Sequence, residues 1–145
     1  MASTPYPAHL NGACSPQLRE EVAFFQQWGY LVVDDALTSE QVDALRTALD
    51  APFAQSDEQF IHQLLECNEA FAFLLDNPPV FSRMKAILGE CVQLHSATAR
   101  VTLPGEKDQN WHRDVPWPVA PEGTPYGAIP GQINCGYYLD ELSED

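Results

Sequence analysis

The feature that most constrains the fold of this chain is a change in its hydrophobic pattern at Gly89. Before Gly89, apolar residues recur at helical spacing, whereas residues 91–103 and 132–139 carry the β-branched and alternating apolar residues typical of strands. Helices followed by strands predict an α+β fold with segregated elements. With a further strand expected around residues 111–115, the chain has three such strands, which neither close a barrel nor complete two sheets, so we expect the sheet to be unfinished.

Capping residues place the expected helices. Ser15 and Pro16 are typical of a helix start and Gly29 of its end, while Thr38 and Gln41 have the spacing of a capping box in a second helix that ends at Pro52. The remaining expected elements are a short strand at 30–33, helical stretches at 55–68 and 70–75, and a helix from the Asn77-Pro78-Pro79 segment to Gly89.

The chain reads as one domain of 145 residues. Residues 1–14 are expected to be a flexible leader, and 15–145 the domain itself, helical over 15–89 and built of strands and a long loop over 91–139. Residues 116–131 contain five prolines and three glycines, which favours a stiffened loop that can cover a site as a lid.

The charge of the chain limits its partners. The formal net charge is −14, so phosphate backbones and anionic membrane surfaces are repelled. No apolar run approaches the ~20 residues of a membrane span, and the N-terminal residues lack the layout of a signal peptide. The four cysteines show no zinc-binding spacing. We therefore expect a cytoplasmic protein that binds neither nucleic acid nor membranes; the sequence gives no oligomeric state.

The motif that carries chemistry is His112-Arg113-Asp114. If it lies at a strand end, residues two positions apart point to the same side, so the imidazole of His112 and the carboxylate of Asp114 converge on one cation while Arg113 points away. One nitrogen and one anionic oxygen suit a divalent metal such as the Fe(II) of 2-His-1-carboxylate oxygenases. The alternative is an exposed histidine paired with a surface carboxylate.

Several segments in the same order resemble the phytanoyl-CoA dioxygenase family. Residues 25–33 followed by 36–42 look like its opening helix, strand and capped helix; 77–89 resembles the helix before its barrel; Trp111-His112-Arg113-Asp114 matches its metal motif; and 134–140 resembles the strand that follows. The resemblance covers about residues 17–145. It implies an N-terminal helical part and an incomplete double-stranded β-helix, a jelly-roll or cupin-like barrel.

The resemblance also implies a function: an Fe(II)- and 2-oxoglutarate-dependent dioxygenase that hydroxylates a small organic substrate, whose identity the sequence does not reveal. The family's second histidine and its 2-oxoglutarate arginine lie further downstream, and none of His9, His62 and His95 stands in that histidine's position. We expect this chain to be a piece of a longer enzyme, inactive alone. A natural truncation without activity, or a site completed across a dimer, are the other interpretations.

Further site residues flank the motif. Arg100, Thr98 and Asn134 are candidates for binding the co-substrate, Arg100 through its guanidinium group. Trp111 and Trp117 are candidates for the substrate pocket. Each has a structural alternative: an outward arginine balancing an acidic surface, polar residues of a strand, and aromatic residues of a core.

Two other function classes compete with the oxygenase. One is a non-catalytic scaffold or interaction module without bound metal. The other is an iron or manganese cupin that does not use 2-oxoglutarate, although cupin motifs cluster more histidines than this chain has.

Overall fold

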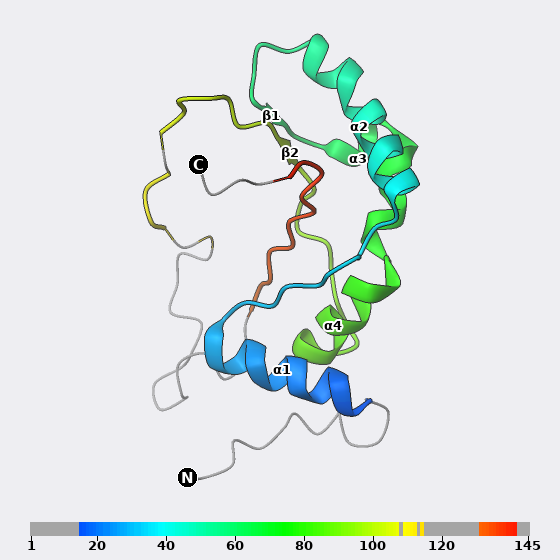
Figure 1. Cartoon of the computed structure of the whole chain (residues 1–145), viewed down its shortest axis with the longest axis vertical. Helices are drawn as coiled ribbons and strands as arrows, with labels where there is room; N and C mark the ends of the chain where they lie inside the picture. Colours follow the sequence, from blue (N-terminus) through cyan, green and yellow to red (C-terminus); the bar gives the residue numbers. More distant parts are fainter. Residues whose placement is uncertain (1–14, 108, 113, 115–130, 142–145) are drawn as a thin grey trace. The chain divides into compact units, whose positions relative to one another are not determined.

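A computed structural model of the protein describes residues 15–107, 109–112, 114 and 131–141. Within these residues the fold is mostly helical, with a single two-stranded antiparallel sheet (Figure 1). The chain divides into two compact units. The described residues of unit 1 are 15–34, 78–93, 114 and 131–133, and those of unit 2 are 35–77, 94–107, 109–112 and 134–141.

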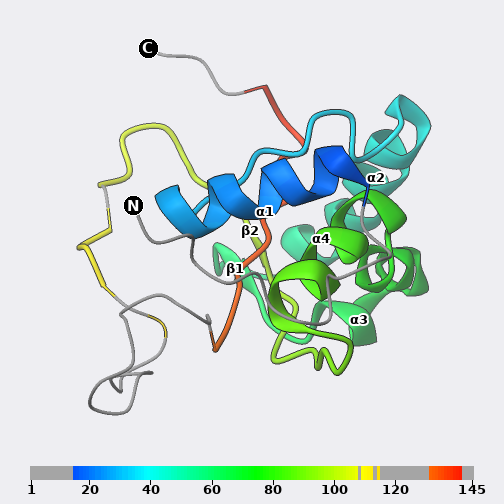
Figure 2. The same ribbon diagram turned by 90° about the horizontal axis from the view of Figure 1, so that it is seen from below.

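Unit 1 is built on two helices, α1 (Pro16–Trp28) and α4 (Pro78–Leu88), which lie side by side (Figures 1 and 2). The Oγ of Ser15 accepts a hydrogen bond from the Leu18 amide at 3.1 Å, and Gly29, at φ 80°, ends α1 in a left-handed conformation. The expected helix boundaries are confirmed here. Val22 is fully buried and packs with Ala86 and Ile87 from α4.

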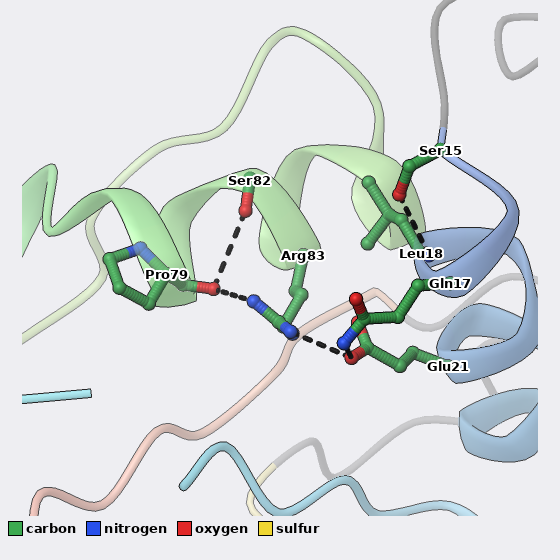
Figure 3. Close-up of polar contacts among 7 residues, drawn as sticks. All are labelled: Ser15, Gln17, Leu18, Glu21, Pro79, Ser82 and Arg83. Carbon is green, nitrogen blue, oxygen red and sulfur yellow. Dashed lines mark hydrogen bonds and ion pairs between the residues drawn. The ribbon is translucent and has the colours of Figure 1, made fainter. Parts of the chain in front are cut away.

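A polar link also joins the same two helices (Figure 3). The Nη2 atom of Arg83 donates to Oε1 of Glu21 at 2.7 Å, and Nε2 of Gln17 donates to the same oxygen at 3.1 Å. The Nη1 atom of Arg83 donates to the carbonyl of Pro79, one turn earlier in α4. Both charged side chains are about four-fifths buried, with 20% and 19% exposed for Arg83 and Glu21.

Unit 2 packs α2 (Ser39–Ala54) against η2, a 3₁₀ helix (Glu69–Leu75), with α3 (Leu64–Cys67) between them in the sequence. The capping box is formed: the Gln41 amide donates to Thr38 Oγ1, and the Thr38 amide to Gln41 Oε1. The core of this unit is a cluster of buried side chains: Leu45, Ala48, Ile61, Leu64 and Phe71.

The sheet of unit 2 pairs β1 (Phe60–Ile61) with β2 (Ala99–Arg100), and Phe60 stands opposite Arg100. Two backbone bonds extend the pairing, from the Val101 amide to the Gln59 carbonyl and from the Leu64 amide to the Ala97 carbonyl. Because neighbouring side chains of a strand point to opposite faces, Ile61 enters the core and Phe60 lies with Arg100 on the other face.

The predicted barrel is wrong. In the described residues, only 60–61 and 99–100 form strands, and residues 91–98, 101–107 and 131–141 belong to no ladder. β-Branched and alternating residues fit a pleated surface only where a partner strand supplies backbone hydrogen bonds. Of residues 134–139, Leu139 instead packs against the buried cluster of unit 2.

Three local predictions are also corrected. Residues 30–33 form no strand; Tyr30 and Val32 are exposed and find no partner strand among the described residues. Residues 55–68 are not one helix, because β1 occupies 60–61 and Gln63 takes a left-handed backbone conformation at φ 56°. Helix α2 continues through Pro52 to Ala54, since a proline in the last turn removes only one helical hydrogen bond.

Hydrogen bonds of Asn77 and Tyr137 connect residues 134–141 to the rest of unit 2. Asn77, only 5% exposed, donates from Nδ2 to the Ala36 carbonyl at 2.9 Å and to the Tyr137 hydroxyl at 3.4 Å. The Tyr137 hydroxyl in turn donates to the carbonyl of Leu74, the penultimate residue of η2, at 3.3 Å. Burial raises the pKa of Tyr137 above its usual value. Cys135 is exposed as a residue, but partial desolvation of its sulfur raises the pKa of its thiol.

These pKa shifts predict alkaline instability. A phenol whose pKa is raised by folding contributes stability that is fully present below its unfolded pKa of about 10 and is lost as the pH rises through the folded value. We expect the Tm to fall between about pH 9 and pH 11, and to fall less steeply in Tyr137→Phe, although that variant starts from a lower Tm. Thermal unfolding followed by circular dichroism tests this. Tyr138→Phe, at a residue 74% exposed, is the control and should keep the wild-type slope; equal slopes in all three proteins would contradict the assignment.

In the part of the chain that the structure describes, no helix combines the length and the apolar composition needed to cross a bilayer.

Candidate functional site

His112 lies in unit 2, in a segment that the structure shows without strand pairing at residues 109–112. Its side chain is exposed, and its Nδ1 atom lies 2.8 Å from the carbonyl oxygen of Asn110. A carbonyl oxygen only accepts, so Nδ1 carries the proton, and in the neutral imidazole the lone pair is on Nε2. Histidines that bind metals are typically held in this way, with one ring N–H on a carbonyl and the other nitrogen toward the metal.

Asp114, the second candidate ligand, is exposed at a bend and belongs to unit 1. The residue between the two ligands, Arg113, lies outside the described residues. The strand end that the sequence predicted for this motif is absent from the described residues 109–112 and 114.

Trp111 is fully exposed, at 104%, so it neither fills a core nor lines a pocket formed by the described residues. Thr98, directly before β2, and Asn134 are exposed on unit 2. Trp117 lies outside the described residues.

Arg100 is the candidate whose surroundings are best defined. Its Nη2 donates to Oε1 of Glu106 at 2.5 Å, and its guanidinium lies over the Phe60 ring, 5.1 Å from the ring centroid. The second carboxylate oxygen of Glu106 accepts from the Leu103 amide at 3.2 Å. The structure thus pairs Arg100 with a carboxylate of its own chain, and its contact with a co-substrate stays a prediction.

The other described histidines do not gather around the motif. The ring of His62 stacks on that of Phe60, with 5.9 Å between centroids and planes 9° apart, and His95 contacts the neighbouring Ser96 hydroxyl at 3.4 Å. His9 lies outside the described residues. Among residues 15–107, 109–112, 114 and 131–141, no group of three or more His, Cys, Asp or Glu side chains is placed to hold a metal ion.

Comparison of the chain with protein-family models, with curated proteins and with solved structures found no match.

Two residues of this region were missed at the level of sequence. Glu106 and Phe60 complete the surroundings of Arg100. The signal for Glu106 was present: Pro104-Gly105 predicts a turn, and a turn at that place brings the side chain after it back toward the strand before it. Phe60 gave no such signal, because its pairing with Arg100 joins positions forty residues apart.

Proposed function

We propose that this chain supplies two ligands, the His112 imidazole and the Asp114 carboxylate, to the Fe(II) centre of a 2-oxoglutarate-dependent dioxygenase acting on a small organic substrate. The observation that carries the proposal is the 2.8 Å hydrogen bond between His112 Nδ1 and the Asn110 carbonyl, which leaves the lone pair on Nε2. The Trp-His-Arg-Asp motif and its resemblance to the phytanoyl-CoA dioxygenase family support it.

The donor set fits iron in its chemistry. A neutral imidazole nitrogen and a carboxylate oxygen are two of the three protein ligands of a 2-His-1-carboxylate centre, and the third is a further imidazole. Bound iron and 2-oxoglutarate supply the oxidising chemistry, with O₂ consumed and CO₂ and succinate released. The residues of this chain contribute binding and orientation: Asn110 fixes the His112 tautomer, and Asp114 adds negative charge.

Three candidates remain for the co-substrate: Arg100, Thr98 and Asn134. Of these, Arg100 alone has the charge to pair with a carboxylate, and its guanidinium already does so with Glu106. We propose that Arg100 provides the ionic contact and that Thr98 and Asn134 provide neutral hydrogen bonds.

The cytoplasm is the compartment we propose for this activity. Cys67, Cys91 and Cys135 are free, exposed thiols, which suits a reducing environment.

Metal binding is the direct test of the proposal. We expect the chain to bind Mn²⁺, used as an EPR-active substitute for Fe(II), and His112→Ala and Asp114→Asn each to weaken that binding by at least about tenfold, because loss of the groups that merely orient a ligand already costs 10–100-fold. His95→Ala is the matched control, an exposed histidine of unit 2 outside the motif, and should bind as the wild type does.

Turnover tests the second half of the proposal. The protein to assay is a longer enzyme that contains this chain together with the second histidine ligand. We expect it to form succinate in a reaction that requires Fe(II) and 2-oxoglutarate, and we expect His112→Ala to abolish that reaction. Unchanged Mn²⁺ affinity in both ligand variants, or unchanged succinate formation in His112→Ala, would sink the assignment.

A metal-free interaction module is the second candidate function. It is favoured by one observation, the exposed aromatic side chains where α1 ends: Phe24 packs edge-on against Tyr30 at 5.3 Å between ring centroids, and Trp28 is 60% exposed. Failure of the Mn²⁺ experiment would leave this candidate in first place.

A further inference from the structure

The carboxylate of Glu106 is bound as a ligand carboxylate would be. One oxygen accepts from the guanidinium of Arg100 at 2.5 Å and the other from the backbone amide of Leu103 at 3.2 Å. A charged donor and a backbone amide acting on separate oxygens of one carboxylate form a common recognition arrangement for anions. All of these groups belong to unit 2.

The turn that carries Glu106 does not need this carboxylate. Pro104 presets the backbone at the second turn position, Gly105 takes φ 82° at the third, and the Glu106 amide donates to the Leu103 carbonyl at 3.1 Å. These backbone features close the turn by themselves. The side chain of Glu106 is therefore able to leave without opening the turn.

Arg100 is held in place independently of Glu106. Its backbone is paired with β1 opposite Phe60, and its guanidinium rests over the Phe60 ring at 5.1 Å from the centroid. A side chain fixed in this way loses little further freedom when it binds an anion. The side chains of Arg100 and Glu106 are 28% and 22% exposed, so solvent reaches the contact.

We propose that Arg100 and the Leu103 amide form a binding site for small organic carboxylates, and that Glu106 is its internal competitor. In the structure Glu106 occupies the site; a free carboxylate displaces it and takes the same two donors, while the Glu106 side chain turns to solvent. Lys107, exposed and next in sequence, offers a second positive charge for a dicarboxylate.

The inference rests on the proposed function only in its choice of a dicarboxylate as ligand. Binding at Arg100 needs no iron, and it is measured without metal. Failure of Mn²⁺ binding at His112 and failure of carboxylate binding at Arg100 are therefore separate results.

The experiment is calorimetric titration of succinate into metal-free protein in the presence of EDTA, with the neutral succinamide as the reference probe. In the wild type, only a fraction of the molecules has Arg100 open to an added carboxylate, because Glu106 occupies it in the others. Removing this competitor raises the apparent affinity by a factor equal to the reciprocal of that fraction. For an ion pair of modest strength, we expect Glu106→Gln to bind succinate about three- to tenfold more tightly than the wild type. Arg100→Gln should lose binding, and no protein should bind succinamide.

Glu58→Gln is the matched control, since Glu58 is an exposed carboxylate two residues before β1, and this variant should bind as the wild type does. A Glu106→Gln variant no tighter than the wild type would overturn the proposal. So would an Arg100→Gln/Glu106→Gln double variant that binds succinate as well as Glu106→Gln alone.

A measurement on the wild type covers the case in which a variant does not fold. Succinate should shift the amide NMR signals of Leu103 and Glu106 in a saturable manner, whereas succinamide should not. Absence of those shifts, or equal shifts with both probes, would also overturn the proposal.

Discussion

Replacing Phe71 by alanine is expected to lower the free energy of unfolding by about 3–5 kcal/mol, the usual cost of truncating a buried aromatic residue. Phe71 is 1% exposed and lies in the same buried cluster as Leu45, Ile61 and Leu64, so its removal opens a cavity that these neighbours fill only in part. Because small domains are stable by only about 5–15 kcal/mol, the variant should lose a large part of its stability. Urea denaturation followed by circular dichroism measures the change.

Leu75→Ala is the matched control for this prediction. Leu75 belongs to the same 3₁₀ helix as Phe71 but is 41% exposed, so its truncation should cost less than about 1 kcal/mol. A Phe71→Ala variant no less stable than Leu75→Ala would show that the cluster is not the core of unit 2.

Helices were predictable from the sequence because their determinants are local. Ser15, Thr38, Gln41 and Gly29 act within one turn of the residues they cap, and each occupies the expected place in the structure. The burial of Val22 and Leu45 is equally a consequence of helical spacing, since a helix brings every third or fourth residue to one face whatever surrounds it.

Strands were not predictable in the same way. Residues 30–33 and 132–139 have the composition and alternation of strands, but a strand also needs a neighbour with unpaired backbone groups. Phe60 and Ile61 do find such a neighbour, although they lie in residues 55–68, which helical spacing predicted to be a helix. The barrel was inferred from a family resemblance and failed for this reason: the pattern of single segments does not reveal which segments pair.

The candidate site shows the same difference between local and long-range determinants. The spacing of His112 and Asp114 is a local feature, visible in three residues, and it remains the basis of the proposed iron site. The pairing of Arg100 with Glu106 depends on a turn, which is encoded by neighbouring residues. The contact of Arg100 with Phe60 depends on a long-range strand pair, which is not. The sequence proposed Arg100 as a ligand of a co-substrate carboxylate, which stays a prediction, and it did not reveal the pairing with Glu106.

Arg83→Met is expected to destabilise unit 1 by about 2–3 kcal/mol. Removing one partner of a fully buried ion pair costs about 3–5 kcal/mol, because the other charge stays buried without compensation, and the one-fifth exposure of Arg83 and Glu21 reduces that cost. Oε2 of Glu21 and Nε of Arg83 are buried and have no hydrogen-bond partner among the described residues, so the carboxylate depends heavily on the guanidinium. Urea denaturation again gives the free energy of unfolding.

The double variant Glu21→Met/Arg83→Met distinguishes the net contribution of the ion pair to the free energy of unfolding from the cost of leaving one charge buried without its partner. Two apolar side chains of similar length leave no buried charge at this site, so the double variant should be close to the wild type in stability and more stable than Arg83→Met. Glu90→Gln breaks the Lys85–Glu90 pair, whose side chains are 37% and 73% exposed, and should change stability by no more than about 0.5 kcal/mol. If Arg83→Met costs no more than Glu90→Gln, solvent screens the pair between α1 and α4 as it screens a surface pair, and apolar packing around Val22 is what joins the two helices.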